Sequence, residues 1–225
     1  MLAAVAAIVA CATTAPLAAA QVPGWLQLSW PFAANTQLQV TCGYESAPSC
    51  SRWHRGTSTY ALDLCDSNAA QCGNGRPVLA AHDGEVVIAG RARQNANGQH
   101  GWCSYGYNVY IKAQNGGEVY YSLYAHLQSI STRRGATVSR GDQIGLLGGS
   151  QCCSGTYSQP ACDVNAFAPH LHFQMTRGGT VYVNSGAVGG GTPVRPEPID
   201  GTRSIAQKGS YTSGSSGSGG GGGGS

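Results

Sequence analysis

The sequence has few charged residues and no helical repeat of apolar residues. Only 10% of its 225 residues are Asp, Glu, Lys or Arg, and the formal net charge is +3. Nucleic-acid-binding domains concentrate Lys and Arg in basic patches, so this composition argues against a nucleic-acid partner. No segment repeats apolar residues at the 3.6-residue spacing of an amphipathic helix. The absence of a helical repeat favours a domain built from strands.

A long apolar run is also missing. The only apolar stretch near the start, residues 2–12, is shorter than the roughly 20 residues that a membrane-spanning helix needs, so we expect no transmembrane segment. Residues 1–20 carry no charge and end in three alanines, which is typical of a signal peptide with its cleavage site. The sequence therefore predicts a secreted protein, extracellular or periplasmic. Because Ile8-Val9-Ala10-Cys11 resembles a lipobox, lipid anchoring at Cys11 is the alternative.

The cysteines lack the paired Cys-x-x-Cys spacing of a structural zinc cluster. Of the nine cysteines, one is Cys11 and eight follow the predicted signal peptide. An even number in an exported chain indicates disulfides. Short spacing favours Cys42–Cys50 and Cys65–Cys72. Adjacent Cys152 and Cys153 are expected to take different partners, with Cys103 and Cys162 as the remaining candidates.

The body of the chain predicts an all-β, antiparallel, disulfide-stabilised domain with an open groove and long loops. We expect this domain over residues 21–208, followed by a flexible Gly/Ser-rich linker or tail over 209–225. Turn signals predict a hairpin of 77–81 with 84–90, a hairpin of 108–112 with 118–124, a short strand within 141–148, and a final pair of 169–176 with 180–183.

Two histidines stand two residues apart in the strand-like run that begins at Pro169. Since side chains alternate along a strand, His170 and His172 should point to one face, and Leu171 and Phe173 to the other. Paired imidazoles on a stiff element suit a metal site, although a chance pair on an exposed strand gives the same pattern.

Three more residues could join this pair. Asp63 lies within an otherwise apolar strand, where a carboxylate is costly unless it is paired or binds a metal. His54 precedes it by a loop containing Gly56, which is long enough to return to the same place. His126 ends the strand of the second hairpin. Taken alone, each of the three has an ordinary interpretation as a turn, surface or strand-end residue.

Together these residues resemble the lysostaphin-type zinc metalloendopeptidases, a family of peptidoglycan hydrolases that also includes staphylolysin. The matching motifs are His54-x8-Asp63, Tyr124-Ala125-His126-Leu127, Pro169-His170-Leu171-His172-Phe173, and a glycine-flanked turn over 135–145. The resemblance covers roughly residues 50–185. The first motif is longer than in the shortest family members, and the loop with Cys152, Cys153 and Cys162 is an addition that we expect to form a wall of the groove.

The resemblance implies a role for each of the five residues. His54, Asp63 and His172 would hold one Zn²⁺ per chain, and His126 and His170 would be catalytic. The substrate would be peptide cross-bridges or stem peptides of peptidoglycan, and we expect a monomer. The alternatives are an inactive relative that binds peptidoglycan or activates another hydrolase, and an adhesion module with incidental histidines. His82 and His100 are assigned to surface loops.

Overall fold

The computed structural model describes residues 20–44, 50, 52–93, 102–155, 160–203, 205 and 209–214. The predicted signal peptide up to residue 19, the lipobox cysteine Cys11 and His100 lie outside these residues. Among the described residues, no helix is long and apolar enough to cross a membrane.

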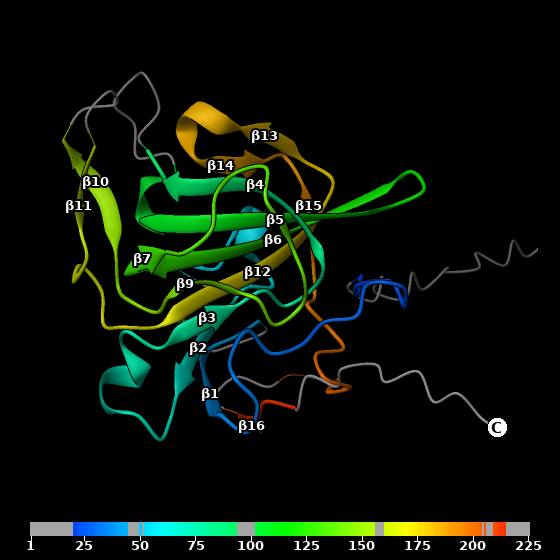
Figure 1. The fold of residues 1–225 in the computed structure, drawn as a ribbon, viewed down its shortest axis with the longest axis horizontal. Coiled ribbons are helices and arrows are strands. Elements are labelled where there is room, and N and C mark those ends of the chain that lie inside the picture. The colour runs from blue at the N-terminus through cyan, green and yellow to red at the C-terminus, as the bar shows by residue number, and fades with distance from the viewer. Residues whose placement is uncertain are drawn as a thin grey trace, which may run out of the picture.

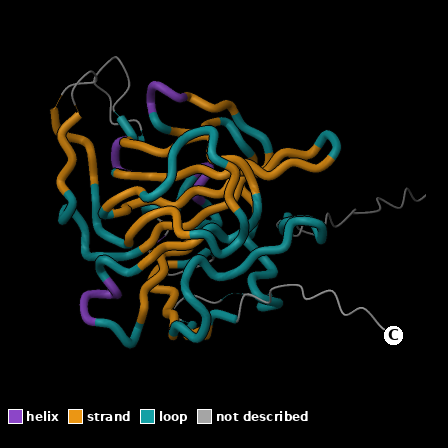
Figure 2. Tube along the Cα trace, viewed as in Figure 1, coloured by secondary structure: helices purple, strands orange, loops and turns teal. Residues whose placement is uncertain are grey.

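Strands dominate the described fold, with four short 3₁₀ turns between them (Figures 1 and 2). This confirms the predicted all-β, antiparallel class. The strands are β1 Gln37–Cys42, β2 Leu62–Asp66, β3 Pro77–Leu79, β4 Gly84–Arg91, β5 Tyr107–Asn115, β6 Glu118–Leu127, β7 Ser129–Ile130, β8 Thr137–Val138, β9 Gln143–Leu146, β10 Gln151–Gly155, β11 Pro160–Asp163, β12 Leu171–Arg177, β13 Thr180–Tyr182, β14 Ala187–Gly189, β15 Thr192–Val194 and β16 Ser210–Thr212. The 3₁₀ turns are η1 Gly56–Ser58, η2 Ala70–Gly73, η3 Cys103–Tyr105 and η4 Val183–Ser185.

The main sheet runs in the order β16-β1-β2-β12-β6-β5-β4-β8, and β15 also pairs with β12. β12 is its central strand, flanked by β6 on one side and by β2 and β15 on the other. Strand β12 therefore fixes the positions of side chains that come from distant parts of the chain. The predicted hairpin of residues 108–112 with 118–124 is present as β5 and β6.

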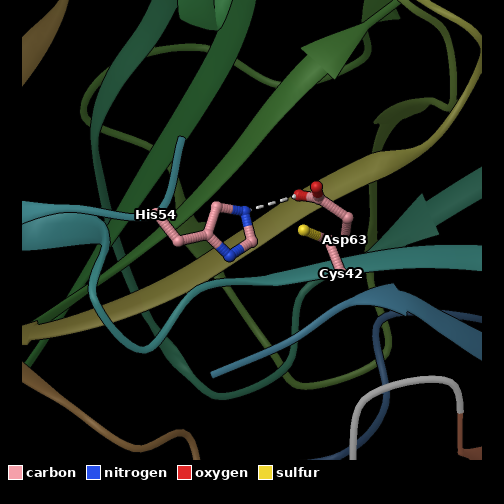
Figure 3. A group of neighbouring side chains, drawn as sticks. All are labelled: Cys42, His54 and Asp63. Carbon is pink, nitrogen blue, oxygen red and sulfur yellow. Dashed lines mark hydrogen bonds and ion pairs between the residues drawn. The ribbon is translucent and has the colours of Figure 1, made fainter. Parts of the chain in front are cut away.

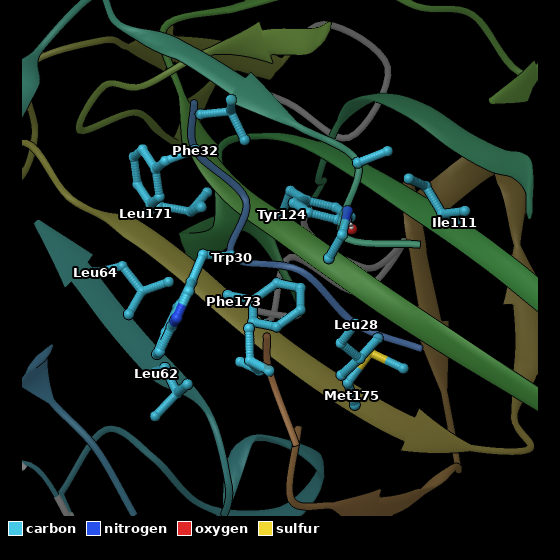
Figure 4. Close-up of a cluster of buried hydrophobic side chains, with 14 of the residues drawn as sticks. Leu28, Trp30, Phe32, Leu62, Leu64, Ile111, Tyr124, Leu171, Phe173 and Met175 are labelled. Carbon is cyan, nitrogen blue, oxygen red and sulfur yellow. Dashed lines mark hydrogen bonds between the residues drawn. The ribbon is translucent and has the colours of Figure 1, made fainter. Parts of the chain in front are cut away.

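The two faces of β12 have different environments. Leu171, Phe173 and Met175 are almost fully buried in the main hydrophobic core (Figure 4). Apolar side chains of the N-terminal segment over residues 22–32 belong to the same core and cover this face. The alternate residues His172 and Gln174 occupy the opposite face, which carries the site described below.

Four disulfides stabilise the fold, as expected for a chain of this cysteine content. The pairs are Cys42–Cys50, Cys65–Cys72, Cys103–Cys153 and Cys152–Cys162. Both predicted local pairs are confirmed, and the adjacent Cys152 and Cys153 take different partners.

Two predicted strand pairs are wrong. β3 pairs with β9 rather than with β4, because β4 forms its ladders with β5 and β8. β13 pairs with β14 rather than with β12, whose two edges are already taken. In both cases a turn signal was identified correctly, but the strands that it joins belong to different sheets.

The first residues of the predicted Gly/Ser-rich linker, 209–225, belong to the folded domain. They form β16, which pairs with β1, and the Tyr211 ring lies 5.2 Å from that of Trp30 between centroids. The Ser213 side chain is buried and accepts the Thr36 N–H at 2.8 Å. Side-chain burial and backbone pairing thus extend the domain at least to this point, and residues 215–225 lie outside the described part.

A buried carboxylate joins both ends of the described chain. Glu197 is fully buried and accepts hydrogen bonds from the Tyr44 hydroxyl, from the Gln21 amide at 3.1 Å and from the Ile205 N–H at 2.6 Å. These donors satisfy a charge that would otherwise be costly to bury.

Candidate metal centre and active site

The site forms around one carboxylate oxygen. β2 and β12 pair so that Asp63 lies directly opposite His172. His172 Nδ1 lies 3.1 Å from Asp63 Oδ1, and His54 Nε2 lies 3.2 Å from the same oxygen (Figure 3 shows His54 and Asp63). His170 Nε2 is 3.9 Å away. The structure therefore brings four of the five predicted residues to a single atom.

His54 is held by the turn that precedes η1. Its backbone N–H donates to the Cys50 carbonyl at 3.0 Å, and Cys50 is bonded to Cys42 at the end of β1. Gly56 follows with a φ of +58°, a conformation that glycine adopts without strain. The disulfide and the turn thereby carry the imidazole back to the neighbouring strand, as its glycine-containing loop predicted.

Electrostatics keep the Asp63 carboxyl ionised. Burial acts to raise its pKa, but the neighbouring imidazoles of His172 and His54 outweigh that effect and hold the pKa of Asp63 well below its usual value. The site consequently presents a negative oxygen between imidazole nitrogens, which is a typical ligand set for zinc.

Cys42 also approaches this group but cannot replace a histidine. Ligand atoms of Cys42, His54 and Asp63 lie within 4.8 Å of one another (Figure 3). The Cys42 sulfur is in a disulfide, and only a thiolate is an effective zinc ligand. His172 is the better third donor, since its nitrogen contacts the same carboxylate oxygen. Tetrahedral zinc at about 2.0–2.1 Å from each nitrogen separates neighbouring ligand atoms by roughly 3.3 Å, close to both observed contacts.

A β-bulge turns His126 toward the site. Between the pairs Tyr107↔Leu127 and Val109↔Tyr124 the register shifts, so that Ala125 and His126 together face Asn108. Regular alternation would place His126 on the core side with Tyr124. Its φ of +62° reverses this direction, and its ring lies 4.7 Å from that of His170 and 5.8 Å from that of His172. Bulges commonly redirect a side chain in this way.

The two predicted catalytic histidines have the same hydrogen-bonding pattern. His126 Nδ1–H donates to the Ser150 carbonyl at 3.0 Å, and His170 Nδ1–H donates to the Ala168 carbonyl at 2.7 Å. Each therefore keeps the Nε2 lone pair for chemistry. Burial, and then the neighbouring His170 and His172, lower the pKa of His126 to about 3. His126 is thus held as a neutral imidazole near pH 7.

The expectation of a surface position for His82 is wrong. Its side chain is 1% exposed, its Nδ1–H donates to the Asp83 carbonyl at 2.8 Å, and Ser122 Oγ lies 2.8 Å from Nε2. The side chain of His82 packs against β6, although Asp83 in the same turn is exposed. This histidine belongs to the core network of Ser122 and Tyr124, away from the carboxylate.

Sequence reasoning missed the partner on the far side of His172. Gln174 Oε1 lies 3.1 Å from His172 Nε2 and accepts the Ser58 hydroxyl at 2.7 Å. Tyr105, which the sequence offered only as one of several aromatics that could line a groove, lies with its ring 5.5 Å from that of His172. Strand alternation, which places Gln174 on the same face as His172, was the available signal.

A pocket of about 500 Å³ adjoins the two catalytic candidates. It is lined by Gln71, Cys72, Asn74 and residues 165–169. Phe167 connects this pocket to the site, because its ring lies 4.9 Å from that of His126 and 6.3 Å from that of His170. The lining residues do not include Cys152, Cys153 or Cys162. The groove wall expected from the loop with those cysteines therefore stays a prediction. A second pocket of about 370 Å³, beside Trp25 and His82, does not include the site histidines.

Known proteins with similar sequences or folds give these residues a context. The family model of peptidase family M23 matches residues 67–185, more than half of the chain. This range includes His126, His170 and His172, and begins after His54 and Asp63.

Solved structures with similar folds include peptidases. The catalytic domain of the antimicrobial peptidase lysostaphin from Staphylococcus simulans is 23% identical, with 65% of this chain and 82% of that one covered and a TM-score of 0.37. The M23 metalloprotease pseudoalterin from the deep sea is 17% identical, with 71% and 79% covered and a TM-score of 0.42. The SpoIIQ–SpoIIIAH pore-forming complex is 16% identical, with 78% and 94% covered and a TM-score of 0.46. On the family match, this chain belongs to peptidase family M23.

Proposed function

We propose that this protein is a secreted, monomeric zinc metalloendopeptidase that hydrolyses peptide cross-bridges or stem peptides of bacterial peptidoglycan. Membership of family M23 supports the peptidase class. The observation that carries the proposal is the meeting of His54, His172 and His170 at one oxygen of Asp63, with His126 beside them. Four disulfides support an oxidising compartment.

The proposed metal ligands are His54, Asp63 and His172, for one zinc ion per chain. Their donor atoms, two imidazole nitrogens and one ionised carboxylate oxygen, are those of many catalytic zinc sites with an open fourth position. When bound, zinc supplies the Lewis acidity that peptide hydrolysis requires near neutral pH. Asp63 keeps both ligand imidazoles oriented toward the same point.

His126 and His170 are the proposed catalytic residues. Each is fixed by a hydrogen bond from Nδ1 to a backbone carbonyl and keeps Nε2 available. Between them they would remove a proton from the attacking water, stabilise the oxyanion and deliver a proton to the leaving amine. Their rings are 4.7 Å apart, so both can reach one scissile peptide bond.

The deciding experiment combines metal analysis with product identification. Purified protein should contain about one zinc per chain and should digest peptidoglycan, and a chelator should abolish digestion. Mass spectra of products from peptidoglycans with different cross-bridges would identify the bond. A folded, zinc-loaded protein that releases no peptide from any of them would contradict the proposal and favour a binding or activating role.

A further inference from the structure

A chain of hydrogen bonds supports His172 from behind. On the side away from Asp63, His172 Nε2 lies 3.1 Å from Gln174 Oε1. Ser58 Oγ donates to the same amide oxygen at 2.7 Å, and Tyr105 Oη lies 2.9 Å from Ser58 Oγ. Gln174 is 2% exposed and Ser58 is 5% exposed. Ser58 and Gln174 are thus buried, and Tyr105, Ser58 and Gln174 form a chain of contacts that ends at His172.

The chemistry of these atoms sets the protonation of His172. An amide oxygen has lone pairs and no hydrogen, so the contact with Nε2 is attractive when Nε2 carries the hydrogen. In a neutral imidazole the lone pair then lies on Nδ1, the nitrogen that faces Asp63. A metal can bind only the nitrogen with the lone pair, so the Gln174 contact selects the tautomer that a metal ligand requires.

Burial makes this contact specific rather than incidental. A buried amide costs free energy unless it is hydrogen-bonded, and an apolar side chain would fill this position more cheaply. Ser58 reaches Gln174 from η1, only four residues after His54, while Tyr105 contacts Ser58 from η3. The amide is therefore held by Ser58 of η1, which is itself held by Tyr105 of η3, and its oxygen is fixed toward the imidazole.

We infer that Gln174 is a positioning residue for zinc binding, which holds His172 in its Nε2–H tautomer and is itself held by Ser58 and Tyr105. This inference rests on the proposed function in so far as His172 is taken as a zinc ligand. Gln174 contacts neither the substrate nor the reacting atoms. It acts through the ring of His172 alone.

The test compares zinc affinities of four proteins by competition with a chromophoric chelator. Gln174→Met keeps the side-chain length but removes the acceptor, and zinc affinity should fall about 10- to 100-fold. Gln174→Glu restores an acceptor, and its zinc affinity should be within about threefold of that of the parent. Thr176→Val is the matched control, because Thr176 is also buried on the same face of β12, two residues further along. It should leave the affinity unchanged.

A spectroscopic readout separates positioning from a general loss of structure. In the zinc-loaded parent, the imidazole N–H of His172 should give a slowly exchanging proton signal, protected by Gln174. Gln174→Met should lose this protection while its metal-free form unfolds at a temperature close to that of the Thr176→Val control.

The outcomes are distinguishable from those of the proposed function. A parent protein that binds no zinc would overturn the proposed function itself. A parent that binds zinc, with Gln174→Met equal to it in affinity and in N–H protection, would overturn only the role of Gln174. Equal losses in Gln174→Met and Gln174→Glu would also overturn it, because the acceptor would then not be the feature that matters.

Discussion

The imidazoles of the site differ in which ring nitrogen they direct inward. His126 and His170 direct Nε2 and bind a carbonyl through Nδ1, whereas His172 directs Nδ1 and binds Gln174 through Nε2. The neighbour on the outer side of each ring decides this difference. Residue type alone, which is the same for all three, could not reveal it.

This division predicts that substitutions of the histidines separate into two classes. His172→Ala should lose zinc because it removes a proposed ligand. His126→Ala should retain zinc but lose at least about 100-fold in turnover, as expected for a general acid–base residue. Metal analysis and peptide cleavage, measured on the same preparations, check this prediction. Loss of zinc from His126→Ala would reverse the assignment of the two residues.

His82 predicts a distinct dependence of stability on pH. Burial lowers the pKa of His82 below its usual value, so the unfolded chain takes up a proton near pH 6.5 that the folded protein does not. The free energy of unfolding should therefore fall as the pH drops below that value, by at most about 1.4 kcal/mol per pH unit from this residue. His82→Gln should lack this part of the slope. Denaturant titrations of both proteins between pH 7.5 and 5 measure it, and parallel curves would contradict it.

At the scale of elements, sequence patterns predicted more of the strands than of their pairing. Residues 108–124 formed the expected hairpin because the turn and the strands are contiguous. The pairs that failed involved β3, whose partner β9 lies far along the chain, and β13, which pairs with the strand that follows it rather than with β12 before it. Alternation correctly placed His170 and His172 toward one site. It would place His126 on the opposite face, because a bulge depends on the register of two strands and leaves little trace in either one.

The disulfides should differ in their contribution to stability. Cys103–Cys153 closes a loop of 50 residues, whereas Cys65–Cys72 closes one of 7. In the chain-entropy description, the first should stabilise by about 4 kcal/mol and the second by about 2.4 kcal/mol. Replacing each pair by two alanines and measuring unfolding in guanidinium chloride tests the order.

An equal loss from the two replacements would show that chain entropy does not dominate. Activity offers a second readout, because Cys103 belongs to the turn with Tyr105, and Cys153 lies close to Ser150. The Cys103–Cys153 replacement should therefore also weaken the support of His172 and His126.

At the scale of the whole molecule, the sequence predicted the all-β fold class and the presence of disulfides, but not where the domain ends. The Gly/Ser bias that begins at Gly209 conceals Tyr211, whose burial against Trp30 is a long-range contact. The five candidate site residues could be proposed from the sequence because their motifs combine. The residues that support them, such as Ser150 and Gln174, could not be predicted. Their contacts with the imidazoles of His126 and His172 form only in the tertiary structure.

Truncation tests where the domain ends. A chain that stops after Gly209 loses β16, the Tyr211–Trp30 contact and the buried Ser213 hydroxyl. We expect its free energy of unfolding to fall by at least about 2 kcal/mol. A chain that stops after Gly214 retains these contacts and should match the full chain. If both truncated chains were equally stable, β16 would not contribute to the fold.

The pairing of β16 with β1 also determines when folding can finish. Gln37 and Thr212 are neighbours across this ladder although 175 positions separate them in the chain. Contacts of such high sequence separation form slowly, because a long loop must close before they give any stabilisation. A ribosome that has released β2, β6 and β12 has already produced all five site residues, yet the outer strand of the sheet is still missing. The edge of β1 should therefore stay unpaired in the nascent protein until β16 has been synthesised.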